Sequence, residues 1–369
     1  MRLQSWRRHG ALTCVLSVIG VLPSTAQRPT LRPAVPVDPI AAILDAFQAH
    51  DVVALGEGGH GHGEGHAFRL SLIRDPRFAR AVGDVVVECG NARYQDVMDR
   101  FVRGEDVPDT ILEQVWRNTT IPTTACDRPT YEAFYRAVRL LNESLPRDRQ
   151  LRVLLGDPPI NWGRVRTPED HFVWFLQRDS FPAETIQREV LAKRRKALVI
   201  YGDMHLQRKQ IAANYETEGV AATLVSLLVE AGASVFNIKT ERAVDVPELQ
   251  ADVATWPIPS LALTRGSVLG AADFTFYYPS GTRRFVLKDG LPDISAPIPR
   301  NGWRAFRMED QFDAVLYLGA PVTTSSPDMP PALCADADYM AMRRERLALV
   351  GPPGSLERLN QYCATQAPQ

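Results

Sequence analysis

The stretch Val52–Gly61, VVALGEGGHG, joins a short apolar run to a glycine-rich turn that carries one carboxylate and one imidazole. An apolar run of this length, bounded by turn residues, is typical of a buried strand in a parallel sheet. Open α/β folds place their chemistry in the loops that follow the carboxyl ends of such strands. Histidine is also the side chain best suited to proton transfer near neutral pH. The stretch predicts an α/β enzyme with His60 as general base, although a Gly-rich turn can also be no more than a turn.

Similar apolar runs follow along the chain, and polar residues stand at their ends: Glu88 in Asp84–Cys89, Asp157 after Leu151–Gly156, and Asp203 and His205 after Ala197–Gly202. Stretches with helical spacing separate these runs, which predicts an α/β fold with a mainly parallel sheet flanked by helices. Because parallel strands end on one edge of a sheet, these side chains can converge there. Each could instead be a satisfied polar residue of the core, but burying a lone carboxylate such as Glu88 is costly.

The chain divides into a leader, a short connecting segment and one domain. Residues 1–26 combine a basic start with the apolar run Ala11–Leu22 and the small residues Ser24-Thr25-Ala26, which predicts a secretory signal peptide. An uncleaved anchor is the alternative. Residues 27–50 form a Pro-rich segment and a helix, and residues 51–369 are expected to form a single α/β domain. A helical insertion over about residues 94–145 could act as a lid over the strand ends or simply pack on the sheet.

The composition indicates which kinds of partner the protein binds and in which compartment it is found. The formal net charge is -1, which offers no electrostatic case for nucleic acid, or for a membrane once the signal is cleaved. We therefore expect a small-molecule substrate and an exported protein, periplasmic or secreted. Export permits disulfides among the four remaining cysteines, of which Cys334 and Cys363 are the simplest pair. The sequence does not choose among the three full pairings, and Cys89, at a strand end, could instead be a buried free thiol or a nucleophile.

The motif residues resemble the erythromycin esterase family. Gly56–Gly61, followed by Glu64 and Phe68-Arg69, is similar to that family's glycine, glutamate and histidine-glycine motif. Glu88 at the end of the next strand and His205 after a later one fit the same order and spacing. The resemblance covers about residues 52–206. It also places the chain in a wider superfamily with the haem-uptake ChaN-like proteins and the TraB/Tiki metalloproteases.

The resemblance implies a role for each motif residue. His60 would activate a water molecule, while Glu57, Glu88 and His205 would orient it and balance charge. This agrees with the chemistry of the residues, because a carboxylate bonded to an imidazole fixes its tautomer and raises its basicity. A second histidine could stabilise the oxyanion. No GxSxG nucleophile elbow is present.

Other polar residues could bind the substrate without firm support from the motif: Glu64, Asp157, Arg164 and Asp203. The implied reaction is hydrolysis of an ester, including a cyclic one, and no cofactor is expected.

Two alternatives remain open. His62 and His66 stand at helical i,i+4 spacing beside the motif and could share a divalent metal with His60 and Glu57, as in the Tiki/TraB branch. A metal would make His60 a ligand rather than a base. The chain could also be a non-catalytic haem- or ligand-binding protein of the ChaN type, for which Tyr94 is a candidate axial ligand.

Overall fold

The computed structural model describes residues 31–208, 222–241, 253–272, 286–288, 291–293, 307–319 and 329–366. The predicted signal peptide, residues 1–26, lies outside them. The chain divides into a unit that ends at Leu31 and a unit that begins at Arg32, and the helices and strands of the described residues belong to the second unit.

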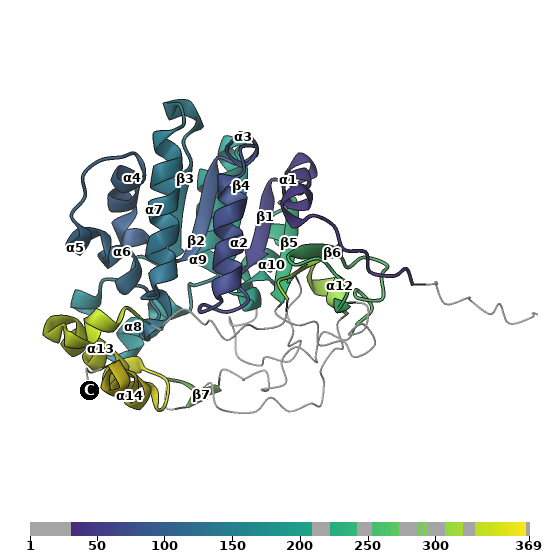
Figure 1. Ribbon diagram of the computed structural model, residues 1–369. Coiled ribbons are helices and arrows are strands. Elements are labelled where there is room, and N and C mark those ends of the chain that lie inside the picture. The colour runs from purple at the N-terminus through teal and green to yellow at the C-terminus, as the bar shows by residue number, and fades with distance from the viewer. Residues whose placement is uncertain are drawn as a thin grey trace, which may run out of the picture. The chain divides into compact units, whose positions relative to one another are not determined.

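One seven-stranded sheet, in the order β3-β2-β4-β1-β5-β9-β6, forms the centre of this unit (Figure 1). Its strands are β1 (Val52–Gly56), β2 (Asp84–Asn91), β3 (Arg152–Asp157), β4 (Ala197–Tyr201), β5 (Val235–Glu241), β6 (Ser260–Leu263) and β9 (Ala314–Tyr317). All neighbouring pairs are parallel except β6 and β9, which pair antiparallel at one edge. A separate antiparallel pair consists of β7 (Val286–Lys288) and β8 (Leu291–Asp293). The predicted α/β class with a mainly parallel sheet is confirmed.

Helices occupy the connections between the strands. The α-helices are α1 (Pro39–Ala49), α2 (Gly63–Arg74), α3 (Phe78–Ala81), α4 (Gln95–Val102), α5 (Asp109–Leu112), α6 (Gln114–Arg117), α7 (Pro129–Glu143), α8 (Pro168–Phe175), α9 (Ser180–Glu189), α10 (Leu224–Glu230), α12 (Met308–Gln311), α13 (Ala337–Val350) and α14 (Ser355–Gln366). Short 3-10 turns are η1 (Ala92–Tyr94), η2 (Thr124–Cys126), η3 (Arg147–Arg149), η4 (Trp162–Arg164), η5 (Leu191–Lys193), η6 (Asp203–Leu206) and η9 (Pro331–Ala335). In the described part of the chain, no helix has the length and apolar character needed to cross a membrane.

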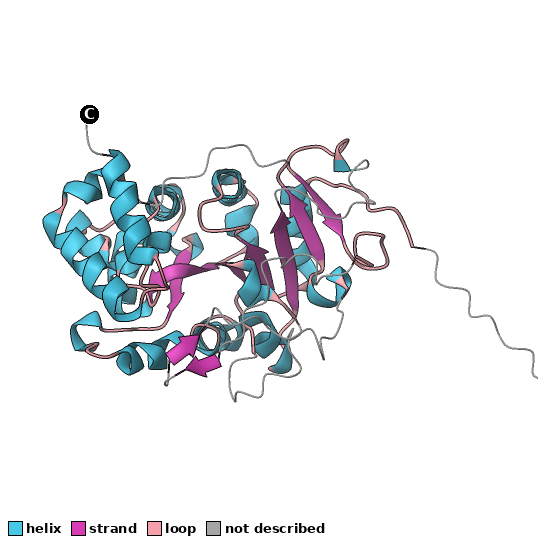
Figure 2. Cartoon of the chain, turned by 90° about the horizontal axis from the view of Figure 1, so that it is seen from below, coloured by secondary structure: helices cyan, strands magenta, loops and turns pink. Residues whose placement is uncertain are grey.

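The helices cover both faces of the sheet, as the view along its edge shows (Figure 2). Successive residues of a strand point to opposite faces, so Val53 and Leu55 of β1 enter one apolar core while Val52 and Ala54 enter the other. The first core is shared with helices α1 to α7, and the second with α9, α10 and α12. Burial on both faces explains why the strands read as continuous apolar runs.

The predicted helical insertion lies in the first of these layers. Phe101 of α4, Trp116 of α6 and Phe134 of α7 are buried in the same core as the strands. These helices therefore pack on the sheet, and a role as a lid over the strand ends stays a prediction. One of them, α7, nevertheless delivers a side chain to the carboxyl edge of the sheet.

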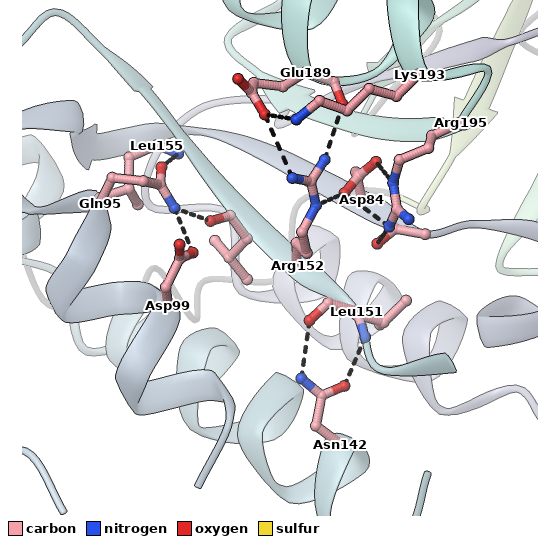
Figure 3. A network of polar contacts seen from close by, with 12 residues as sticks. Asp84, Gln95, Asp99, Asn142, Leu151, Arg152, Leu155, Glu189, Lys193 and Arg195 are labelled. Atoms are coloured by element: carbon pink, nitrogen blue, oxygen red, sulfur yellow. Dashed lines mark hydrogen bonds and ion pairs between the residues drawn. The ribbon is translucent and has the colours of Figure 1, made fainter. Parts of the chain in front are cut away.

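Charged side chains tie the opposite, amino edge together (Figure 3). Asp84, the fully buried first residue of β2, accepts hydrogen bonds from Nε of Arg152 at 2.6 Å and from Nε of Arg195 at 2.7 Å. Arg152 also donates to the backbone oxygen of Glu189 at 2.9 Å. A carboxylate buried at this depth is stable only when it is paired. These contacts therefore hold β2, β3 and the end of α9 in register.

The two disulfides join different parts of the fold. Cys334–Cys363 links η9 to α14, which confirms the simplest pairing. Cys89–Cys126 links β2 to η2, just before α7. The expectation of a free thiol at Cys89 is therefore wrong. The partner stands 37 residues away in a short 3-10 turn, and nothing in the strand pattern around Cys89 indicated it.

The carboxyl-terminal helices have a small core of their own and attach through buried arginines. Arg343 of α13, fully buried, donates from Nε and Nη2 to the two oxygens of Asp127, at 2.8 and 2.6 Å. Arg346 donates to Asn118 at 2.6 Å and stacks on Trp162, with 4.3 Å between its guanidinium carbon and the ring centre. Helix α13 thus fixes the loop that leads into α7.

Candidate active site

The turn after β1 has a backbone that depends on glycine. Gly58 and Gly59 have φ values of +64° and +107°, which side chains with a Cβ rarely adopt. Gly56 lacks room for a Cβ, because the carboxylate of Asp203 lies against its Cα. The turn brings Glu57 and His60 back toward the sheet edge and leads directly into α2.

Glu57, His60 and Tyr131 form a closed triangle of short contacts. Nδ1 of His60 lies 2.9 Å from Oε2 of Glu57 and 2.7 Å from the hydroxyl of Tyr131. The same hydroxyl donates to Oε2 of Glu57 at 2.8 Å. Since the carboxylate can only accept, the proton between His60 and Glu57 belongs to Nδ1. In the neutral ring Nε2 then carries the lone pair, and no described residue is hydrogen-bonded to it.

Burial and charge set the protonation of this triangle. Burial raises the pKa of Glu57, but the hydrogen bond with His60 and the charge of Arg69 together outweigh burial. The pKa therefore lies below its usual value and the carboxylate is ionised. Burial lowers the pKa of His60, yet the hydrogen bond with Glu57 and the charge of Glu88 leave it above its usual value. Burial and the charge of Glu57 raise the pKa of Tyr131, which keeps the phenol protonated.

Glu88 is the second buried carboxylate of the edge. Its Oε2 accepts from the backbone N–H of Gly202 at 2.7 Å, and its Oε1 is ion-paired with Nη2 of Arg178. Nε2 of His205 lies 3.5 Å from the same Oε1. Although burial raises the pKa of Glu88, the neighbouring His205 and Arg178 bring it well below the usual value.

His205 lies between two carboxylates. Its Nδ1 is 2.8 Å from Oδ1 of Asp179, which also accepts from the backbone N–H of Leu224 at 2.7 Å. Burial lowers the pKa of His205, but the negative charges of Asp179 and Glu88 have the larger effect and raise the pKa to about 10. At neutral pH this imidazole is therefore a cation, whose Nε2–H lies at the edge where Glu88 and His60 meet.

The structure brings three of the predicted residues within reach of one small ligand or ion. One ligand atom from each of Glu57, His60 and Glu88 lies within 4.8 Å of the others. The histidines at helical spacing are not part of this group. His62 is buried in the turn, with Nε2 3.3 Å from Oε2 of Glu64, and the pKa of His66 falls to about 4 because burial and Arg69 disfavour its charge.

The charges around these carboxylates test whether a divalent metal suits the site. Three carboxylates, those of Glu57, Glu88 and Asp179, face three cations: Arg69, Arg178 and protonated His205. This charge is balanced without an ion, whereas metal sites gather carboxylates whose charge the ion neutralises. The donor atoms are close enough for a metal, but the arginines make the set a poor match for one.

The predicted substrate-binding residues have different surroundings. Asp157 is buried and accepts from the backbone N–H and the hydroxyl of Thr120, at 2.7 and 2.5 Å, and burial raises its pKa to about 7. Asp203 is held against Gly56 and the backbone N–H of Thr240, at 3.3 Å, and burial raises its pKa. Arg164 is exposed on η4, and Glu64 lies beside His62.

Three residues of the site were missed from the sequence: Tyr131, Arg178 and Asp179. Tyr131 opens a helix whose apolar spacing reads as packing, and Arg178 and Asp179 stand in a polar connection between α8 and α9. Their roles depend on where those elements lie in space. The candidate haem ligand Tyr94 is half-buried, and its hydroxyl accepts from Asn118 at 2.9 Å.

Comparison with known proteins supports the fold. Neither a search of protein-family models nor one of curated proteins finds a match. Among solved structures, a Bacillus cereus protein matches over 78% of this chain and 95% of its own, at 11% identity and a TM-score of 0.50. A succinoglycan biosynthesis protein matches over 78% and 94%, at 11% identity and a TM-score of 0.52.

A variant of erythromycin esterase EreC in its open conformation is also matched, over 79% of this chain and 94% of that one, at 14% identity and a TM-score of 0.48. A match at this score carries no argument, and the two matches at 11% identity show shared fold alone. The chain therefore has the α/β fold of the Bacillus cereus protein and of the succinoglycan biosynthesis protein.

Proposed function

We propose that the protein is an exported hydrolase that cleaves an ester, including a cyclic one, by attack of a water molecule that His60 activates. The observation that carries this proposal is the anchoring of Nδ1 of His60 by both Glu57 and Tyr131. A ring held in this way presents a basic Nε2 in a fixed direction, which a general base requires. The two disulfides are compatible with an oxidising compartment.

The steps follow from the position of each group. Nε2 of His60 takes a proton from water as its oxygen attacks the ester carbonyl. Glu57 stabilises the resulting imidazolium through Nδ1. His205 and Arg178 are cations that both form ion pairs with Glu88. They stabilise the negative charge that develops on the carbonyl oxygen. When the carbon–oxygen bond to the leaving group breaks, His60 returns its proton to the alkoxide. The products are an acid and an alcohol, or one hydroxy acid when the ester is cyclic.

The experiment is a hydrolysis assay on a panel of esters and lactones, comparing the wild type with His60→Gln. Loss of a general base lowers kcat by about 10² to 10⁴. His50→Gln is the matched control, because His50 is also half-buried but precedes β1 at the other edge of the sheet, where its Nδ1 contacts the hydroxyl of Ser234 at 3.0 Å. Equal kcat in wild type and His60→Gln would overturn the proposal.

A metal-dependent hydrolase is the second candidate, because Glu57, His60 and Glu88 lie close enough to share an ion. In that case the purified protein would contain stoichiometric zinc, manganese or cobalt, and His60→Ala would lose both the metal and chelator-sensitive activity. The three cations beside the carboxylates favour the mechanism without a metal. Metal analysis of wild type and His60→Ala separates the two, and an absorption spectrum of the same samples tests for bound haem.

A further inference from the structure

A cavity of about 260 Å³ lies between η2 and the carboxyl-terminal helices, lined by residues outside the candidate active site. One face of α14 lines it with Ser355, Arg358 and Tyr362, at helical spacing. Thr124 of η2 and Leu347 of α13 complete the opposite walls. The volume is below the range of about 300–1,000 Å³ that is usual for drug-sized ligands, so it suits one group of a molecule.

Among the described residues that line the cavity, the charged side chains are two arginines. Arg128 and Arg358 approach the cavity from different elements, and the side chains of the described residues that line it include no carboxylate. The α14 helix, 12 residues long, begins at Ser355 on the same wall, so the positive end of its dipole adds to the field. The hydroxyl of Thr124 is a neutral polar group of the lining, whereas that of Ser355 donates to the backbone oxygen of Pro352 at 2.6 Å. The remaining lining, including Leu347 and Tyr362, is largely apolar. These features together suit an anion carried on a short apolar group.

Arg128 connects the cavity with the candidate active site. A methyl group placed on Gly61 would lie 2.7 Å from Nη1 of Arg128, so the guanidinium lies directly against the turn that holds His60. Arg128 also immediately precedes α7, whose third residue is Tyr131. A ligand on this guanidinium is therefore one side chain away from the Glu57–His60 turn.

We propose that this cavity binds the anionic end of the substrate, a carboxylate or a phosphate on a short apolar group, with Arg128 and Arg358 as its cationic partners. As an assignment of substrate class, this rests on the proposed ester hydrolysis. As an anion site, it stands on the lining alone. Guanidinium groups suit both anions because their planar donors can bind two oxygens at once.

Binding is measured first, by calorimetry on the purified chain with benzoate and with phenyl phosphate as probes. We expect saturable binding of at least one of them at concentrations up to about 10 mM. Arg128→Gln and Arg358→Gln should each weaken it about tenfold or more, since one charged hydrogen bond is worth at least about a factor of ten. Arg344→Gln is the matched control: Arg344 bonds Asn360 between the same two helices but does not line the cavity.

The substrate assignment is then tested with two esters that share a leaving group, 4-nitrophenyl butyrate and the mono-4-nitrophenyl ester of glutaric acid. The wild type should prefer the anionic ester in kcat/KM, and Arg358→Gln should lose about tenfold of that preference. Arg358 is exposed, so its variant is expected to fold even if Arg128→Gln does not.

Each outcome decides one of the two proposals. No binding of either probe, or equal affinity in wild type and Arg358→Gln, would overturn the anion site. Binding that depends on both arginines, without hydrolysis of any ester, would keep the anion site and remove the hydrolase. Hydrolysis without preference for the anionic ester would keep the hydrolase and overturn the substrate assignment.

Discussion

The hydroxyl of Tyr131 lies 2.7 Å from Nδ1 of His60 and 2.8 Å from Oε2 of Glu57, so that one phenol from α7 contacts both partners of the candidate base. Glu57 and His60 come from a turn whose two glycines have positive φ values, and such a turn has few restraints of its own. The phenol supplies the missing restraint. The geometry of the base therefore depends on a helix more than seventy residues away along the chain.

Tyr131→Phe should lower kcat of the hydrolase about tenfold while the protein remains folded. The change removes the hydroxyl that fixes His60, and the retained Glu57 contact preserves the tautomer. Tyr135→Phe is the matched control, because that hydroxyl is also buried, one turn further along α7, but donates to the backbone oxygen of Cys89 at 2.6 Å. Both variants should lose about 1 kcal/mol of unfolding free energy. Equal kcat values for the two would show that the phenol of Tyr131 has only a structural role.

The charge of His205 should make stability depend on pH in the alkaline range. Its pKa rises from 6.5 to about 10 on folding, so the stabilisation is complete below pH 6.5 and is lost as the pH rises through about 10. His205→Gln removes this dependence. Chemical denaturation of both proteins at several pH values checks it: the gap in unfolding free energy should shrink from pH 6.5 to pH 10. A constant gap would mean that His205 is not a cation in the folded protein.

Asp157 should make stability depend on pH in the same direction, but in the range from acidic to neutral pH. Its pKa rises from 3.8 to about 7 because the carboxylate is buried, so folding favours the protonated form, and this contribution is lost as the pH rises from 3.8 through about 7. Asp157→Asn keeps an acceptor for Thr120 and has no charge. The melting temperature of the variant should rise relative to that of the wild type between pH 5 and pH 8. A difference in melting temperature that does not change with pH would contradict this.

Removal of either disulfide should lower stability, but only removal of Cys89–Cys126 should also lower activity. Each closes a loop of similar length, with the two cysteines 37 and 29 positions apart in the sequence, so removal of either costs roughly 3–4 kcal/mol in the chain-entropy model. Cys89 follows Glu88 directly, and Cys126 stands five residues before Tyr131. Replacing both by Ala should therefore also lower kcat, whereas the Cys334→Ala, Cys363→Ala double variant should keep it at temperatures where both are folded. Equal activity of the two double variants would show that the first disulfide does not position the site.

Much of the sheet could be predicted from the sequence, because strands buried on both faces must be apolar throughout. Val52–Gly56 and Ala197–Tyr201 were found in this way, and so were the polar residues that follow them. The antiparallel strand Ser260–Leu263 was not identified, since a four-residue edge strand has too little pattern.

The candidate site could be predicted only as far as the strand ends determine it. Glu57, His60 and His205 follow parallel strands and Glu88 lies in the last half of one, and the ends of parallel strands share one edge of a sheet by necessity. Arg178 reaches Glu88 across ninety residues of sequence, and no local pattern indicates such a partner. The same reason explains the missed Cys89–Cys126 bond, because a pairing between elements is a property of their packing.

The contact between Asp203 and Gly56 limits how this chain can change in evolution. The carboxylate fills the space that a Cβ at position 56 would need, so any larger residue there requires a smaller one at position 203. A chain that alters only one of the two loses the packing of β1 against the turn after β4. Positions 56 and 203 should therefore co-vary among sequences of this fold, and the pair could help recognise relatives with the same strand-end architecture at identities where whole-chain comparison fails.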